Sequence, residues 1–131
     1  MCDFREILKL IYKPDVGSLW AAPNAIWKNS FASNKPGTEF HPAILERNSP
    51  CNTISQIVPG TRKMHPAGSC VYKVKLDPSF DTTYFLLKFS MPYLNSEILT
   101  MKRGWNGINE LNEIQLNEFK LQIKFCKGID V

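Results

Sequence analysis

The 131-residue sequence lacks the patterns that mark several large classes of protein. No apolar run approaches the ~20 residues that a membrane-spanning helix needs. The first residues are too rich in charge for the apolar core of a signal peptide. Neither a GxxxxGK[ST] loop nor a GxGxxG loop is present, so no pattern predicts nucleotide-dependent chemistry. We therefore expect a cytoplasmic protein that does not associate with a membrane.

Cysteine and histidine are also scarce. The four cysteines, Cys2, Cys51, Cys70 and Cys126, form no CxxC pair and no dense framework, so no structural disulfide is expected. Cys51, His65 and Cys70 lack the close-paired spacing of zinc ligands. A Cys–His nucleophile has no supporting local sequence. We expect neither a metal nor a cofactor.

The overall amino-acid composition is typical of one compact domain. Hydrophobic residues make up 44% of the chain and charged residues 21%, as in soluble globular proteins. The nine prolines favour many short segments joined by turns. A net charge of +4 is a weak indication of polyanionic partners.

Periodicity predicts a mainly β chain with a helix at each end. Helices are predicted over about 3–12 and 109–127, where apolar residues recur at helical spacing. Turn-forming residues make 24–38 a long loop. Short strands are predicted within 17–101, at about 17–22, 41–47, 53–58, 70–76 and 83–89. We expect a single domain, 1–131, in which a strongly bent sheet closes into a small barrel.

Two of these strands would bring polar side chains together. His41-Pro42 precedes the apolar run Ala43-Ile44-Leu45, and Pro59-Gly60 is expected to stop the next strand. That stop would leave Thr61, Arg62 and Lys63 at the rim of the sheet. If the strands pair, a histidine, a hydroxyl and two cations share one patch, which is the candidate site.

These residue types suit attack on a phosphodiester, which needs proton transfer and positive charge near the phosphate. His41 would act as base or acid, because an imidazole titrates near neutral pH. Arg62 or Lys88 would stabilise charge, and Thr61 would position the phosphate. His65 lies close by in sequence and would contact the same ligand.

Each of these residues also has a structural explanation. His41 would cap its strand by bonding a neighbouring carbonyl, and Thr61 after a glycine would form a turn. Arg62 and Lys63 would be an ordinary solvated pair, and His65 an exposed loop residue. The sequence leaves both explanations open.

A basic, glycine-bounded loop at 102–107 adds two candidates for RNA binding. Arg103 would contact phosphate. Trp105 would stack on a base or plug one end of the barrel.

The order of several segments resembles the PemK/MazF toxins, which are small SH3-like barrels related in fold to the CcdB gyrase poisons. The resemblance covers about Gly17 to Lys124. It rests on four short segments followed by a C-terminal helix: Gly17-Ser18-Leu19-Trp20, His41-Pro42-Ala43-Ile44-Leu45, Val58-Pro59-Gly60-Thr61 and Phe85-Leu86-Leu87-Lys88-Phe89-Ser90-Met91-Pro92.

The resemblance implies a toxin of a toxin–antitoxin pair that cuts single-stranded RNA without a metal, as a homodimer bound by a cognate antitoxin. Thr61 matches the family's threonine at the end of the second core strand. His41 stands where arginine is common, Lys88 where some members carry a catalytic arginine, and Ser90 where many carry an acid. The sequence thus departs from the family at the usual base, and a titratable ring replaces a phosphate-binding fork.

A second interpretation belongs to another class. The same barrel would serve as a non-catalytic interaction module, either an antitoxin-bound relic of a toxin or a binder that resembles the gyrase poisons.

Overall fold

The computed structural model describes residues 14–27, 39–50, 53–62 and 70–131. The helix predicted over 3–12 lies outside the described residues, as do Lys63 and His65 of the candidate site. The single-domain assignment therefore stays a prediction for the chain as a whole.

The described chain is mainly β, as the sequence predicts. Its strands are all antiparallel and follow the order β4-β5-β3-β2-β1-β7, with β6 also paired to β3. Within the described ranges no pairing joins β4 to β7, so the sheet bends without closing. The expected closed barrel is corrected on that point. The strands are β1 (Leu19–Pro23), β2 (Phe40–Asn48), β3 (Ile54–Thr61), β4 (Val71–Val74), β5 (Thr83–Leu86), β6 (Met91–Leu94) and β7 (Lys102–Arg103).

Strand β3 is where the sheet bends. Its first residues pair with β6, and its last two, Gly60 and Thr61, pair with Phe85 and Tyr84 of β5. The prediction that Pro59-Gly60 stops this strand was wrong. A Cβ at position 60 would lie 2.8 Å from the Phe85 ring and 3.0 Å from Pro42 Cγ, so glycine is needed for close packing at the bend.

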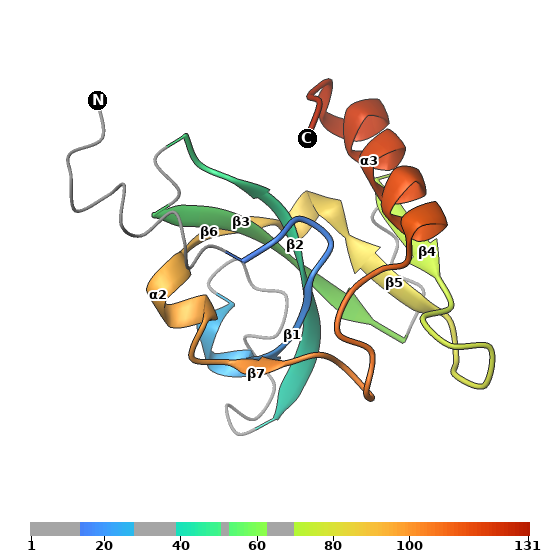
Figure 1. Ribbon diagram of the computed structural model, residues 1–131, viewed down its shortest axis with the longest axis horizontal. Helices are drawn as coiled ribbons and strands as arrows, with labels where there is room; N and C mark the ends of the chain where they lie inside the picture. The colour runs from blue at the N-terminus through green and yellow to red at the C-terminus, as the bar shows by residue number, and fades with distance from the viewer. Residues whose placement is uncertain (1–13, 28–38, 51–52, 63–69) are drawn as a thin grey trace.

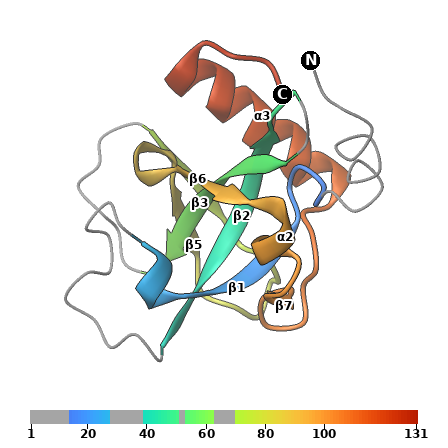
Figure 2. The ribbon, with the colours of Figure 1, turned by 90° about the vertical axis from the view of Figure 1, so that its left-hand side faces the viewer.

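Successive side chains of the central strands pack into two separate hydrophobic cores. Leu19, Ile44 and Val58 face the first core, whereas Trp20 and Leu45 face the second. The first core lies under α3 (Glu113–Lys127) and includes Phe119 and Ile123, and the second includes Ile98 of α2 (Asn95–Ile98). Helix α3 packs beside β4 and α2 beside β6, and Figures 1 and 2 both show α2 away from α3.

Helix α3 begins four residues later than predicted because Asn112 caps it. The Asn112 side chain accepts a hydrogen bond from the Gln115 backbone N–H, and the Gln115 side chain accepts one from the Asn112 backbone N–H. Gly128, with φ 70°, ends the helix. Three large apolar side chains stay exposed on α3: Ile114, Leu121 and Phe125.

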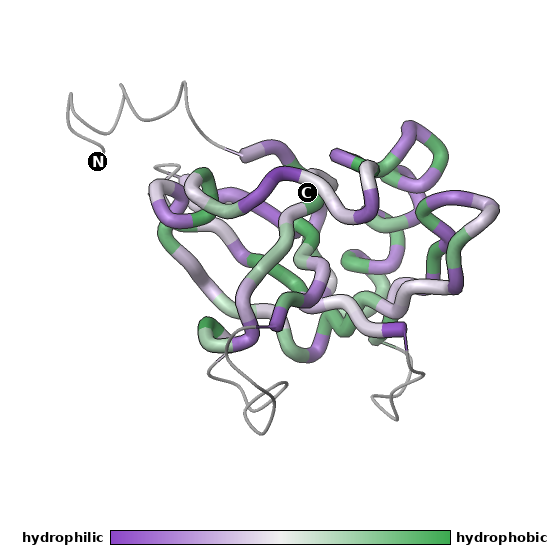
Figure 3. Tube along the Cα trace, turned by 90° about the horizontal axis from the view of Figure 1, so that it is seen from below, coloured by the Kyte–Doolittle hydropathy of each residue, from purple (hydrophilic) through white to green (hydrophobic). Residues whose placement is uncertain are grey.

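The segment after β5 differs from the prediction. The strand expected over 83–89 ends at Leu86, and the 3₁₀ turn η3 (Leu87–Phe89) leads to β6, which the sequence analysis missed. Figure 3 shows hydrophobic and hydrophilic residues alternating in short stretches along the chain. In the part of the chain that the structure describes, no helix is long and apolar enough to cross a bilayer.

Candidate functional site

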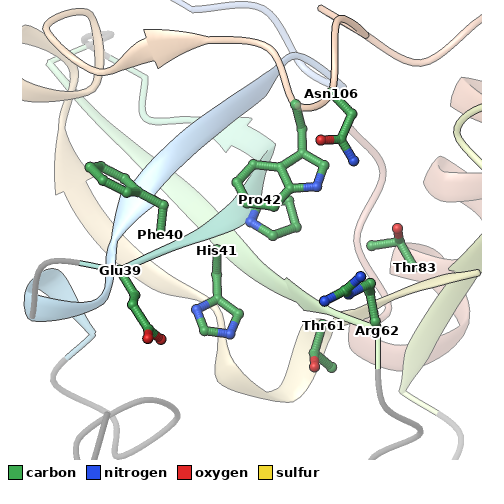
Figure 4. Close-up of a pocket in the computed structure, with 9 residues that line it drawn as sticks. Glu39, Phe40, His41, Pro42, Thr61, Arg62, Thr83 and Asn106 are labelled. Carbon is green, nitrogen blue, oxygen red and sulfur yellow. The ribbon is translucent and has the colours of Figure 1, made fainter. Parts of the chain in front are cut away.

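A cleft of about 410 Å³ opens where β2 begins and β3 ends. Both strands of the predicted patch contribute to it, which the pairing of Ala43 with Pro59 explains. In Figure 4 the imidazole of His41 lies between the Glu39 carboxylate and the Thr61 side chain, with Arg62 on the Thr61 side. The residues that line the cleft are Glu39, Phe40, His41, Pro42, Thr61, Arg62, Thr83, Trp105 and Asn106.

His41 is half-buried and is held by a residue from another element. Its Nδ1 lies 2.5 Å from Oδ1 of Asn24, whose side chain is only 2% exposed. Asn24 begins the 3₁₀ turn η2 (Asn24–Ile26) directly after β1, and β1 pairs Ala22 with His41. An amide oxygen only accepts hydrogen bonds, so this contact favours the ring form that carries its proton on Nδ1.

Thr61 and Arg62 reach the cleft because β3 runs on past Pro59. Thr61 is half-buried and paired with Tyr84, whereas Arg62 is exposed. A second hollow of about 220 Å³ continues from the cleft toward Phe80 and Asp81, and Arg62, Trp105 and two other residues line both. The two hollows together offer an extended path, with a guanidinium shared between them.

Trp105 and Arg103 have different surroundings, although both come from the predicted basic loop. Trp105 is half-buried, packs on the first core and lines the cleft. Arg103 lies with its guanidinium carbon 5.0 Å from the Trp20 ring centroid, and its Nε donates a hydrogen bond to the Asn109 carbonyl at 3.1 Å. Arg103 does not line the cleft in the described chain. Trp20 is buried.

The structure does not bring Lys88 and Ser90 to the cleft. Both line another hollow, of about 310 Å³, beside Lys127 of α3. The Lys127 ammonium donates to Ser90 Oγ at 2.6 Å and to Glu46 Oε1 at 2.5 Å. Ser90, which the resemblance aligns with an acidic position, is a hydroxyl that accepts a hydrogen bond from Lys127.

Glu46 is fully buried, which the sequence analysis did not predict. Leu45 pairs with Ile57 and Arg47 with Gln56, so Glu46 is the extra residue of a β-bulge. Bulges redirect side chains, and here the carboxylate meets Lys127. Arg47 Nε lies 3.2 Å from Oε2 as an ion pair, although that oxygen accepts no hydrogen bond within the described residues.

Cys70 and Cys126 line the same hollow as Lys127, and both are free thiols. Burial, together with a smaller contribution from a hydrogen bond with Cys70, raises the pKa of the Cys126 thiol to about 12. Cys126 is therefore protonated at neutral pH, which argues against a nucleophilic role.

Two polar residues were not assigned to the site from the sequence: Glu39, which lines the cleft, and Asn24, whose side chain contacts His41. Glu39 lies two positions before His41, so its carboxylate could have been noticed from sequence distance alone. Asn24 was interpreted as a turn former in a long loop, and only the fold brings it to His41.

The described residues contain no group of three or more His, Cys, Asp or Glu that could hold a metal ion. Of the three residues weighed for a zinc site, Cys51 and His65 lie outside the described ranges.

Comparisons with known proteins place the fold. No protein-family model and no curated protein sequence matches the chain. Among solved structures, MazF from Deinococcus radiodurans aligns with a TM-score of 0.55 at 17% identity, over 90% of this chain and 99% of that one. The MazE–MazF structure from the same organism aligns with a TM-score of 0.53 at 15% identity, over 91% and 99%. The bent antiparallel sheet with its C-terminal helix is thus similar in fold to MazF.

Proposed function

We propose that the protein is a metal-independent endoribonuclease, the toxin of a toxin–antitoxin pair, which cuts single-stranded RNA in the cytoplasm. The observation that carries the proposal is the convergence of His41, Thr61 and Arg62 on one cleft. The likeness to MazF supports the choice of RNA as substrate.

The proposed step is an in-line displacement at phosphorus. His41 Nε2 takes the proton from the 2′-hydroxyl, and O2′ forms a bond to phosphorus while the P–O5′ bond breaks. The products are a 2′,3′-cyclic phosphate and a 5′-hydroxyl, whose oxygen takes its proton from water. A base in this role contributes typically 10²–10⁴-fold in rate.

The other residues of the cleft have electrostatic roles in this step. Arg62 places a permanently charged donor fork near the phosphate oxygens, and the Thr61 hydroxyl donates to the same group. Glu39 favours the imidazolium that forms when His41 takes the proton. Lys88, Ser90 and Arg103 are omitted from the proposed site because none of them lines the cleft.

The shape of the site supports a polymeric substrate. The cleft and the second hollow share Arg62, so a chain could run from one to the other and pass the guanidinium. Trp105 lines both and offers an aromatic face for a base beside the cut.

The test is incubation of the pure protein with a defined single-stranded RNA in the presence of a chelator, with both new ends mapped. Fragments that carry a cyclic phosphate and a 5′-hydroxyl are expected. Intact RNA over a range of sequences, or cleavage that disappears with the chelator, contradicts the proposal.

We also propose a homodimer and an antitoxin partner. The MazE–MazF complex among the structural neighbours supports the second. The exposed apolar side chains of α3, with Phe125 72% exposed, support a partner that covers this helix. Light scattering should give twice the chain mass, and Phe125→Glu should reduce that mass if α3 lies in the interface.

A second candidate function is a non-catalytic interaction module, and the exposed face of α3 favours it. In that case the RNA stays intact, a protein partner binds tightly, and Leu121→Glu weakens that binding while His41→Ala leaves it unchanged.

A further inference from the structure

We infer that Asn24 is a positioning residue, which holds the His41 ring with its proton on Nδ1 and its lone pair on Nε2. The inference deepens the proposed function, and its kinetic part rests on that function. Its structural part concerns only the tautomer of His41 and can be tested without measuring RNA cleavage.

Asn24 is well suited to hold a ring because its own backbone is fixed on both sides. Its N–H donates to the Glu39 carbonyl at 2.9 Å, and its carbonyl accepts from the Trp27 N–H at 3.2 Å. Trp27 is 3% exposed and packs in the second core, so η2 is anchored there. The carboxamide therefore projects from a rigid turn rather than from a free loop.

The contact with His41 selects one form of the imidazole. Nδ1 and Oδ1 lie 2.5 Å apart, and the oxygen has no proton to give, so Nδ1 must donate. A neutral imidazole has one proton, and with it on Nδ1 the basic lone pair is left on Nε2. Fixing one nitrogen thus decides which atom can take a proton from a substrate.

The burial of the Asn24 side chain strengthens its preference for the tautomer of His41 with the proton on Nδ1. With Asn24 2% exposed, water is a poor substitute acceptor at its position, and a lost hydrogen bond there leaves a buried polar group unsatisfied. A neutral acceptor also has a different effect from a carboxylate, because it fixes the ring without a full charge in contact. The charged side chains that face the cleft are Glu39, from the segment before β2, and Arg62, from the end of β3.

Three variants separate positioning from simple packing. Asn24→Leu keeps the volume and removes the acceptor. Asn24→Asp keeps an acceptor and adds charge, so it should retain the tautomer and raise the pKa of the imidazole. Asn117→Leu, at an exposed position of α3, is the matched control for an Asn-to-Leu change.

The direct measurement is long-range ¹H–¹⁵N NMR of the histidine rings in the full chain above the imidazole pKa, with His41→Ala to assign the signals. In the unmodified protein and in Asn117→Leu we expect a protonated Nδ1 and an unprotonated Nε2 for His41. Asn24→Leu should lose this single form, and Asn24→Asp should keep it. A proton on Nε2 in the unmodified protein, or an unchanged tautomer in Asn24→Leu, overturns the inference.

The kinetic measurement is the pH profile of RNA cleavage. Asn24→Leu should lower kcat at least tenfold with little change in KM. In Asn24→Asp the acidic limb should move to higher pH, because neutral His41 then requires more alkaline solution. An unmoved limb and an unchanged kcat in both variants would contradict the positioning role. Absence of cleavage in the unmodified protein would contradict the proposed function and leave the NMR result to decide the inference.

Discussion

Strand β2 carries a histidine near one end and a buried glutamate toward the other, about 15 Å along the strand. The two side chains have opposite surroundings. His41 is half-buried, bonds a neutral amide and lines an open cleft. Glu46 is fully buried, sits on a bulge and is closed off by the Lys127 ammonium.

The contrast separates function from structure within one strand. A neutral partner and access to solvent leave an imidazole able to exchange protons. The fully buried Glu46 carboxylate pairs with the ammonium of Lys127, and this ion pair ties α3 to the sheet at a desolvation cost. Changes near His41 should therefore alter chemistry, and changes near Glu46 should alter stability.

The largest stability effect is expected at the ion pair. Lys127→Ala leaves the Glu46 charge buried and without its main partner, and should cost about 3 kcal/mol. Urea unfolding measures this cost. Lys124→Ala, which breaks an exposed pair with Asp130, is the control on the same helix and should cost under about 1 kcal/mol. Equal costs for the two variants would refute the special role of Glu46.

A double variant sharpens this prediction. Glu46→Leu combined with Lys127→Met removes both charges, and should recover most of the stability lost in Lys127→Ala. If the double variant is as unstable as the single one, the cost comes from lost packing rather than from an unpaired charge.

A smaller cost is expected at the bend that joins the two regions. Gly60→Ala places a methyl 2.8 Å from the Phe85 ring, and overpacking of this kind costs about 1–3 kcal/mol. Because Thr61 follows directly, the same variant should also slow RNA cleavage. Adding Phe85→Leu should restore part of the lost stability and part of the lost cleavage rate. A Gly60→Ala variant as stable as the unmodified protein would show that the bend does not need glycine.

At the cleft itself, Arg62→Ala should raise KM for RNA about tenfold, equivalent to about 1.4 kcal/mol, and leave the melting temperature unchanged. The salt dependence of binding should also weaken, because one phosphate contact is lost. Lys102→Ala removes an exposed cation on β7 that does not line the cleft. If Arg62→Ala and Lys102→Ala raise KM for RNA by similar factors, RNA binding depends on the net charge of the protein and not on the position of Arg62.

A last prediction concerns the reactivity of Cys126, which lines the hollow beside Lys127. Since burial raises the pKa of its thiol to about 12, the reactive thiolate is rare at pH 8. Alkylation of Cys126 in the folded protein should be at least tenfold slower than in urea, as followed by mass spectrometry. Equal rates would show that the thiol is neither buried nor hydrogen-bonded in solution.

The local parts of the structure could be predicted from the sequence. Apolar residues at helical spacing predicted the helix over 109–127 that contains α3, and the strand predicted over 70–76 contains β4. The strands that carry His41, Thr61 and Arg62 are near neighbours in sequence, and these three residues line one cleft in the structure.

The rest depends on distant contacts that local patterns do not encode. Asn24 meets His41 across 17 residues, and Glu46 meets Lys127 across 81. Pro59-Gly60 resembles a turn in isolation, yet Phe85 packs against Gly60 and keeps the strand continuous. In each case tertiary packing overrode a local preference.

The most direct measurement compares RNA cleavage and thermal unfolding of the unmodified protein and His41→Ala under the same conditions. Our account predicts a loss of at least about 10²-fold in cleavage rate, with nearly the same melting temperature. Cleavage at an unchanged rate by His41→Ala would contradict the central claim that this imidazole moves the proton.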